Sequence, residues 1–308
     1  MKENLSTTTS ITSTYAGEFA GQYIQAALLA APTLGNSLIT IKPNIKYKEV
    51  VKKLATESIL AAATCDFTAT GTVTLTERIL TPVEFQVNLQ LCKKDFHSDW
   101  EAIQMGYSAF DQLPKNFTDF LIGNLSESVG DAIETGIWQH STNVLTGFTL
   151  LFKDDADVVD VSGTTITAAN VQAELAKVVA AGAALNTKNP VIYAAKDIVS
   201  YYLISLGGFG AAGLGSNGYE NKGPNQVINQ LYFAGVPIIE TPGLATSEMV
   251  MAEKENLWFG TGLLNDTNQV KVLDMADIDG SENVRFIMRF TAGVQYGIGA
   301  EIVYYWIY

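Results

Sequence analysis

The sequence predicts an α+β protein in which one segment is inserted into a discontinuous domain. Three observations lead to this class. The stretch from Glu282 to Tyr308 alternates in character with a period of two, which indicates strands. Residues 114–140 place apolar residues at every fourth position, which indicates a helix. Between them, residues 166–275 alternate helical and strand patterns, as an α/β-type unit does.

The terminal stretch is unusual because its last residues are aromatic. Phe286, Met288 and Phe290 form one face of a predicted strand, and the chain ends on the aromatic-rich run Tyr304–Tyr308. Chain ends are usually small and polar unless they are tied into the fold. We therefore expect the final strand to reach the core and to complete the fold.

The predicted helix over residues 114–140 is long. Pro114 suits its first turn, and 27 residues would span about 40 Å. Its apolar stripe consists of Phe117, Leu121, Leu125, Val129, Ile133 and Ile137. One apolar stripe on an otherwise polar helix predicts that the helix lies on the surface of a core.

Residues 37–92 read as strands of an extended hairpin. In one strand Val73, Leu75, Glu77 and Ile79 interleave with a fully polar face of Thr72, Thr74, Thr76 and Arg78. A two-stranded hairpin with a solvated face and few core anchors is marginally stable alone. We therefore expect this segment to be laid across a partner.

Charge is distributed unevenly along the 308 residues, whose net charge is −13. Residues 1–115 hold 10 basic and 11 acidic residues, whereas the remainder holds 9 and 21. The early part carries a basic cluster of Lys42, Lys46, Lys48, Lys52 and Lys53. Nucleic acid is a poor partner, because the cluster lacks arginine and the chain as a whole would repel phosphate. Contact with an acidic surface of a neighbouring subunit and a simple solvated strand face both remain open.

No residue pattern supports an enzyme, a cofactor or a metal. Cys65 and Cys92, with His97 and His140, lack the spacing of a zinc site, and we expect free thiols. GFGAAG at Gly208–Gly213 follows a predicted helix instead of a strand, so a dinucleotide role is rejected. The acidic run from Asp154 to Asp160 lacks the pattern of a calcium loop and reads as an exposed turn. No run of about 18 apolar residues predicts a membrane span.

The order of these pieces resembles the major capsid protein of tailed bacteriophages, the Hong Kong 97-type fold. The diffuse motif behind this resemblance begins with Gly235–Val236–Pro237–Ile238 and a turn at Pro242–Gly243. A strand MVMAE then runs into WFGTG, and the ending GVQYGIGAEIVYY is similar to the closing strands of that family. The resemblance covers nearly the whole chain.

The resemblance implies a role for each region. Residues 1–36 would be an N-terminal arm, and 37–95 an extended loop lying over a neighbour. Residues 96–165 and 276–308 would form a peripheral domain with the long spine helix, and 166–275 an inserted axial domain. The glycine-rich loop Gly207–Gly223 would approach the symmetry axes. Inter-subunit contacts are expected at Lys46, Lys48, Lys52, Lys53, Glu77 and Arg78.

The implied function is an icosahedral shell built from pentamers and hexamers of this chain, found in the virion capsid and, during assembly, in the host cytoplasm. It would enclose double-stranded DNA without reading its sequence and would have no membrane. A separate scaffolding protein, a portal and decoration proteins are the implied partners. The alternatives are an encapsulin-type shell of a cellular nanocompartment, or a soluble α+β binding protein or enzyme.

Overall fold

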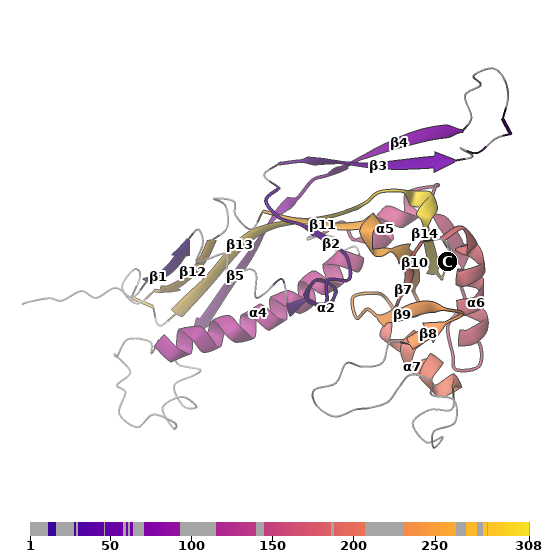
Figure 1. The fold of residues 1–308 in the computed structure, drawn as a ribbon. Helices are drawn as coiled ribbons and strands as arrows, with labels where there is room; N and C mark the ends of the chain where they lie inside the picture. Colours follow the sequence, from indigo (N-terminus) through magenta and orange to yellow (C-terminus); the bar gives the residue numbers. More distant parts are fainter. Residues whose placement is uncertain are drawn as a thin grey trace, which may run out of the picture.

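The computed structural model describes residues 12–16, 28, 30–45, 47–57, 60, 62–63, 71–92, 115–139, 145–185, 188–206, 231–262, 269–275, 280–281 and 283–307 (Figure 1). Within these residues the strands form two six-stranded sheets and a separate two-stranded hairpin.

The first sheet is organised around the long strand β13 (Asn283–Tyr296). One edge of β13 pairs with β5 (Val83–Cys92), and the other pairs with β12 (Gln269–Asp274) and β11 (Leu257–Thr261), all antiparallel. Farther out, β1 (Thr12–Ala16) pairs with β12, and β2 (Thr40–Lys42) runs parallel to β11. The predicted period of two is confirmed, because Phe286, Met288 and Phe290 are buried, whereas Arg285 and Arg289, which alternate with them, are exposed.

The long helix α4 (Lys115–Trp138) confirms the helix predicted over residues 114–140 and runs alongside β5 and β13 (Figure 1). Val129, Ile133 and Ile137 of the predicted stripe are buried, while Phe117 and Leu121 have side chains outside the described set. The short helix α2 (Pro32–Gly35) packs against α4. None of the described helices has the length and apolar character needed to span a membrane.

The second sheet holds shorter strands. Its order is β6 (Val159–Ser162), β14 (Ile302–Trp306), β10 (Met249–Glu253), β7 (Pro190–Ala194), β9 (Val236–Glu240) and β8 (Leu231–Phe233). Helix α6 (Val171–Ala181) packs on β6 and β14, and α7 (Lys196–Ser205) packs on β9. Helix α5 (Phe148–Lys153) contacts both α4 and β13. The described residues also contain three 3-10 turns, η1 (Ala183–Leu185), η2 (Lys254–Asn256) and η3 (Gly299–Glu301).

The hairpin consists of β3 (Glu49–Glu57) and β4 (Thr72–Leu80), paired antiparallel from Glu49 opposite Leu80 to Glu57 opposite Thr72. It forms a sheet of its own and projects beyond the body of the molecule (Figure 1). The extended segment expected over residues 37–95 is therefore divided, because β2 and β5 pair within the first sheet.

Some strand pairs join segments that were expected to lie in different regions. Strand β14 was expected with residues 96–165 and 276–308; it pairs with β6 of that region and also with β10 of the region expected over 166–275. Strands β11 and β12 were expected within 166–275, yet both pair with β13. Periodicity reveals a strand but not its partner, so the order along the chain could not predict these pairings. The division into four regions stays a proposal.

Candidate functional site

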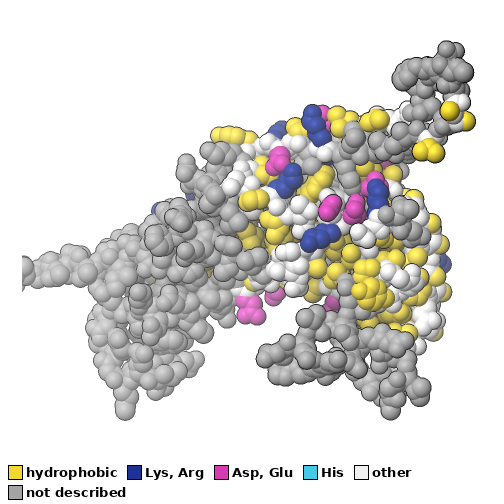
Figure 2. Space-filling model, in the orientation of Figure 1, with side chains coloured by type: hydrophobic (Ala, Val, Ile, Leu, Met, Phe, Trp, Pro, Cys, Tyr) yellow, Lys and Arg dark blue, Asp and Glu magenta, His cyan; other side chains and the backbone are white. Residues whose placement is uncertain are grey.

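The candidate functional site is the projecting hairpin, defined as β3 and β4, together with the residues that hold its base. Residues paired across an antiparallel ladder point to the same face. One face, which we call the apolar face, therefore contains Val50, Lys52, Val73, Leu75, Glu77 and Ile79. Four of these side chains are apolar and still well exposed: Val73 at 66%, Leu75 at 53%, Ile79 at 52% and Val50 at 48%. Figure 2 shows hydrophobic side chains at the surface along this hairpin.

The base of the hairpin is packed on the body through its other face. Leu80 is fully buried in a small cluster with Ile45 and Trp258. Gly260 of β11 makes this approach possible, because a Cβ at that position would lie 2.7 Å from atoms of Leu80 and of Ile45. The hairpin is therefore fixed at one end while its apolar face stays open.

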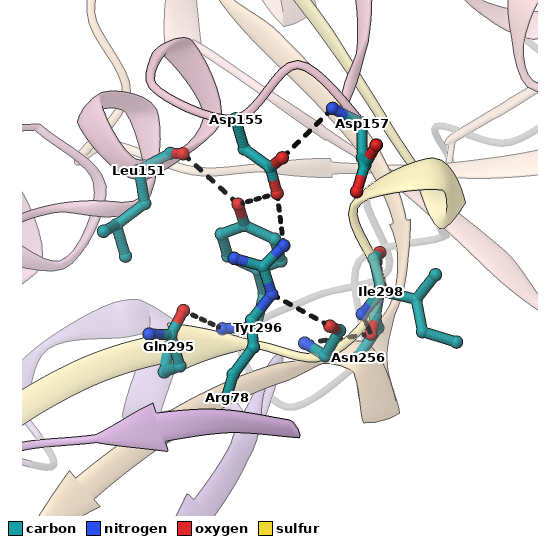
Figure 3. Close-up of polar contacts among 9 residues, drawn as sticks. Arg78, Leu151, Asp155, Asp157, Asn256, Gln295, Tyr296 and Ile298 are labelled. Atoms are coloured by element: carbon teal, nitrogen blue, oxygen red, sulfur yellow. Dashed lines mark hydrogen bonds and ion pairs between the residues drawn. The ribbon is translucent and has the colours of Figure 1, made fainter. Parts of the chain in front are cut away.

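Arg78 is the polar anchor of the same face (Figure 3). Its guanidinium forms an ion pair with the Asp155 carboxylate and lies over the Tyr296 ring, 4.3 Å from the ring centre. Its Nε donates a hydrogen bond of 3.1 Å to the backbone carbonyl of Gly297. Arginine alone among the basic residues can fork and stack in this way, so a lysine here would lose most of these contacts.

The ionisation states of the two groups beside Arg78 suit its positive charge. Burial opposes ionisation of Asp155, but hydrogen bonds from the Tyr296 hydroxyl (2.6 Å), from the Asp157 backbone and from Arg78 outweigh it and lower the pKa of Asp155. Burial, together with the hydrogen bond to Asp155, raises the pKa of Tyr296. Asp155 is thus the ionised acceptor, and Tyr296 remains a neutral donor.

The turn that accepts from Arg78 is itself held by Asn256. The Asn256 Oδ1 atom accepts hydrogen bonds from the backbone N–H groups of Gly297 (3.2 Å) and Ile298 (2.9 Å). Its Nδ2 atom donates to the Ile298 carbonyl at 2.9 Å. Because Asn256 is fully buried, these three bonds fix the carbonyl of Gly297 where Arg78 reaches it.

This geometry corrects one expectation about the hairpin. The face of Thr72, Thr74, Thr76 and Arg78 was expected to be the solvated one. At the base that face turns toward the body, because Arg78 and Leu80 have partners there. Thr72, at the far end of that face, is exposed, and so are the apolar residues of the opposite face.

The structure describes the six residues predicted for inter-subunit contact to different extents. Lys46 and the side chain of Lys53 lie outside the described residues. Lys48 is exposed just before β3. Lys52 and Glu77 form a 2.6 Å ion pair across the apolar face, with side chains 56% and 49% exposed. Arg78 has its partners within its own chain, and a role of any of the six in contact between subunits stays a prediction.

Sequence reasoning missed Asp155 and Tyr296 as partners of the hairpin. Asp155 was read only as part of an exposed acidic turn, and Tyr296 lay within the predicted terminal strands without any assigned partner. One signal was available, because Arg78 is one of three arginines in the chain and interrupts a run of threonines. A lone arginine in such a place points to a specific carboxylate partner.

Chemistry-bearing groups are sparse in the described part of the chain. No cluster of three or more His, Cys, Asp or Glu residues there could hold a metal ion. Cys92 is a free, half-buried thiol, as expected, and Cys65 lies outside the described residues. The loop Gly207–Gly223, with its rejected GFGAAG motif, is also outside them.

Comparison of the whole chain with solved structures gives matches to viral and virus-like shells. A chain of the satellite phage P4 procapsid, which includes a size determination protein, matches with a TM-score of 0.59 and 14% identity, covering 92% of this chain and 89% of that one. A capsid chain of cyanophage A-1(L) matches at 0.57 and 11%, covering 90% and 92%. A virus-like particle from Pyrococcus furiosus matches at 0.53 and 8%, covering 94% and 99%.

Neither the models of protein families nor the curated proteins give a match to this sequence. At such low identities the structural matches define the fold. The chain has the Hong Kong 97-type α+β fold of phage capsid proteins, as the sequence predicted. These three matches extend over 90% to 94% of the chain.

Proposed function

We propose that this protein is the major capsid protein of a tailed bacteriophage and assembles into the icosahedral shell that encloses the genome. The observation that carries the proposal is the exposed apolar face of the projecting hairpin on a fold shared with capsid chains. Contiguous apolar surface on a soluble chain marks an interaction site. The hairpin has a rigid base and an open apolar face, which suits it to reach another copy.

The energetic contribution of this face is substantial when many copies repeat it. Val50, Val73, Leu75 and Ile79 are about half exposed. Burying the rest of each would contribute roughly 1 kcal/mol, since complete burial of such a side chain is worth about 1.5–3 kcal/mol. The exposed Lys52–Glu77 ion pair lies on the same face and contributes little binding energy by itself. Its two charges would instead set how a partner is aligned on this face.

The remaining basic residues of the predicted contact set support the same partner. Lys48 and Lys52 lie in the part of the chain that is nearly charge-neutral, whereas residues 116–308 carry 9 basic and 21 acidic residues. Attraction between the early part of one copy and the later part of another follows from this asymmetry. A net charge of −13 also keeps the shell from holding packaged DNA by counterion release.

The further partners belong to the same proposal. Pentamers and hexamers of this chain would form the shell with the help of a separate scaffolding protein, a portal and decoration proteins. Assembly would take place in the host cytoplasm and end in the virion. The function proposed is structural, without catalysis or a cofactor.

Electron microscopy of the purified full-length protein tests the proposal. We expect closed particles, either from the chain alone or when it is co-expressed with the phage scaffolding protein. A chain that stays monomeric at high concentration under both conditions would exclude a shell function. Large particles that protect double-stranded DNA from nuclease identify a phage capsid. Small uniform particles that co-purify with an enzyme would identify a cellular nanocompartment instead.

A further inference from the structure

Strand β5 has one edge that no described strand covers. Its other edge pairs with β13 along all ten of its residues, and within the described residues this is its only ladder. The strand is open to solvent, because the side chains of Glu84, Gln86, Asn88, Leu89 and Gln90 are exposed. Backbone groups on such an open edge can form the ladder of a further strand.

A groove of about 790 Å³ lies between β5 and α4. Phe85, Val87 and Leu89 line it from β5, and Leu125, Val129 and Ile133 line it from α4. Glu84 and Gln86 also line it, although their side chains alternate with these and point to the other face of the sheet. The groove therefore extends to the open edge of β5, where the apolar Leu89 is 38% exposed. A strand added at this edge could place apolar side chains in the groove.

The sequence of β5 lacks the features that keep an edge strand from pairing with another chain. Edge strands are commonly protected by lysine, by proline or by a β-bulge. The ten residues of β5, VEFQVNLQLC, contain neither lysine nor proline, and the ladder to β13 runs without a bulge. Glu84 is the single charged residue among them. The strand is therefore suited to accept a partner strand along its whole length.

We propose that the open edge of β5 pairs with the same edge of a second copy, antiparallel and across a twofold axis perpendicular to the sheet. The first sheets of the two copies would become one continuous sheet, with both α4 helices on the same face. Side chains of the partner strand would then enter the groove beside α4. Because this is a contact between assembling copies, it rests on the proposed function, although it does not involve the hairpin.

The side chains of β5 are complementary to those of a second β5. Its polar face carries Gln86, Asn88 and Gln90, and the twofold axis would place these amides opposite the amides of the other copy. Its groove face would likewise place apolar residues opposite apolar residues. The single charge, Glu84, would lie opposite Gln90 or Cys92, so no like charges would oppose one another.

Symmetry leaves two registers that pair nine residues of each strand. Residues opposite one another in an antiparallel ladder share a face, so one residue must lie opposite its own copy. With Val87 in this position residues 83–91 are paired, and with Asn88 residues 84–92 are paired. Leu89 then lies opposite Phe85 or Val87 of the second copy, and either residue helps to cover its exposed surface.

A twofold contact of this kind would join different rings of the shell. Neighbours within a pentamer or a hexamer meet through two different surfaces, whereas a twofold axis brings the same surface of two copies together. The paired β5 strands would therefore link a copy in one ring to a copy in the next ring.

Single cysteines test the contact in assembled particles. Cys65 and Cys92 are first changed to serine, and V87C or N88C is then introduced. After mild oxidation, one of these two variants should run as a disulfide-linked dimer on a non-reducing gel, because only the residue beside the axis lies opposite its own copy. A176C, at an exposed position of α6, should stay monomeric.

The outcome of this experiment separates the contact from the shell function. Particles in which neither V87C nor N88C forms a dimer would overturn the contact and leave the shell function standing, and so would equal linking of A176C. Where no particles form, the same oxidation is applied to the soluble variants. A lack of linked dimers there would overturn the contact as well.

A charge exchange at Asn88 distinguishes a contact between copies from a folding defect. In both registers the two residues at position 88 lie opposite or diagonal to one another on one face, so N88K alone or N88E alone brings like charges together. Each variant should lower association, measured by sedimentation, several-fold, and an equal mixture of the two should recover much of it. The neutral N88Q should associate normally. Unchanged association of N88K, or a mixture of correctly folded variants that does not recover, would overturn the proposal.

Discussion

The guanidinium of Arg78 lies 4.3 Å from the centre of the Tyr296 ring, and this contact joins the projecting hairpin to the central strand of the first sheet. Arg78 comes from β4, and Tyr296 is the last residue of β13. The Asp155 carboxylate binds both of them. A segment with little core of its own is thus oriented by one cation held between a ring and a carboxylate.

Replacing Arg78 with alanine should loosen the hairpin without unfolding the body. The change leaves Asp155 partly buried without its cation, and we expect a loss of about 2 kcal/mol in the free energy of unfolding. Urea denaturation measures the loss, and limited proteolysis should show faster cutting within residues 49–80. Arg285→Ala is the matched control, since Arg285 is exposed and bonds only Gln90 at 3.0 Å in the described contacts. If both variants behave alike, Arg78 is not an anchor.

A lysine on the apolar face should block assembly, whereas a lysine next to it on the other face should not. Val73 and Thr72 are adjacent and both exposed, but they point to opposite faces of the hairpin. Val73→Lys would place a charge where a neighbouring copy buries apolar surface, so particles should be lost while the subunit keeps its melting temperature. Thr72→Lys adds the same charge and should assemble normally. Electron microscopy and sedimentation distinguish the two, and a reversed result would assign contact to the threonine face.

Reversing the charge of the basic cluster should also prevent assembly. The variant with Lys46, Lys48, Lys52 and Lys53 changed to glutamate would repel the acidic part of a neighbouring copy. The subunit should still fold, since the Lys52–Glu77 pair is exposed and of small value. Changing the same four residues to arginine keeps the charge and serves as the control. Normal shells from the glutamate variant would remove the cluster from the contact set.

Acid should weaken the hairpin anchor through Asp155. Its pKa in the folded chain lies below the usual value of 3.8, so the fold favours the ionised form. This contribution is fully present above pH 3.8 and is lost as the pH falls through the lower folded pKa. Urea denaturation from pH 2 to pH 6 should therefore show a decline at the acid end that Asp155→Asn reduces. An unchanged decline in the variant would assign acid sensitivity to other carboxyl groups.

Removing one hydroxyl from the final strand should destabilise the second sheet. The Tyr305 hydroxyl donates to Glu174 Oε2 at 2.8 Å and accepts from the Thr164 backbone N–H at 2.9 Å. Tyr305→Phe removes this donor from the buried Glu174, at a cost of about 1–3 kcal/mol in the free energy of unfolding. Tyr47→Phe is the control, because Tyr47 is 85% exposed. A thermal melt in which both variants match the wild type would show that the hydroxyl of Tyr305 contributes no stability.

The sequence by itself determined which segments are strands and which are helices. The alternation around Phe286 and Met288, and the four-residue spacing from Leu125 to Ile137, each record burial of one face, a property of neighbouring residues along the chain. The same patterns supported the α+β class and the resemblance to the fold found. They also predicted that the aromatic end at Tyr304 and Tyr305 would reach the core, where both are fully buried.

Only the tertiary structure decided which segments meet. A period of two does not predict that β14 pairs with β10 and not with β13, because strands pair through backbone hydrogen bonds, which do not depend on the side-chain pattern. Nor could it tell which face of the hairpin stays open, since that depends on Asp155 and Tyr296, which lie 77 and 218 residues beyond Arg78 in the sequence. The pattern of neighbouring residues predicts which face of an element is buried, whereas the packing of the whole chain determines which distant segment covers that face.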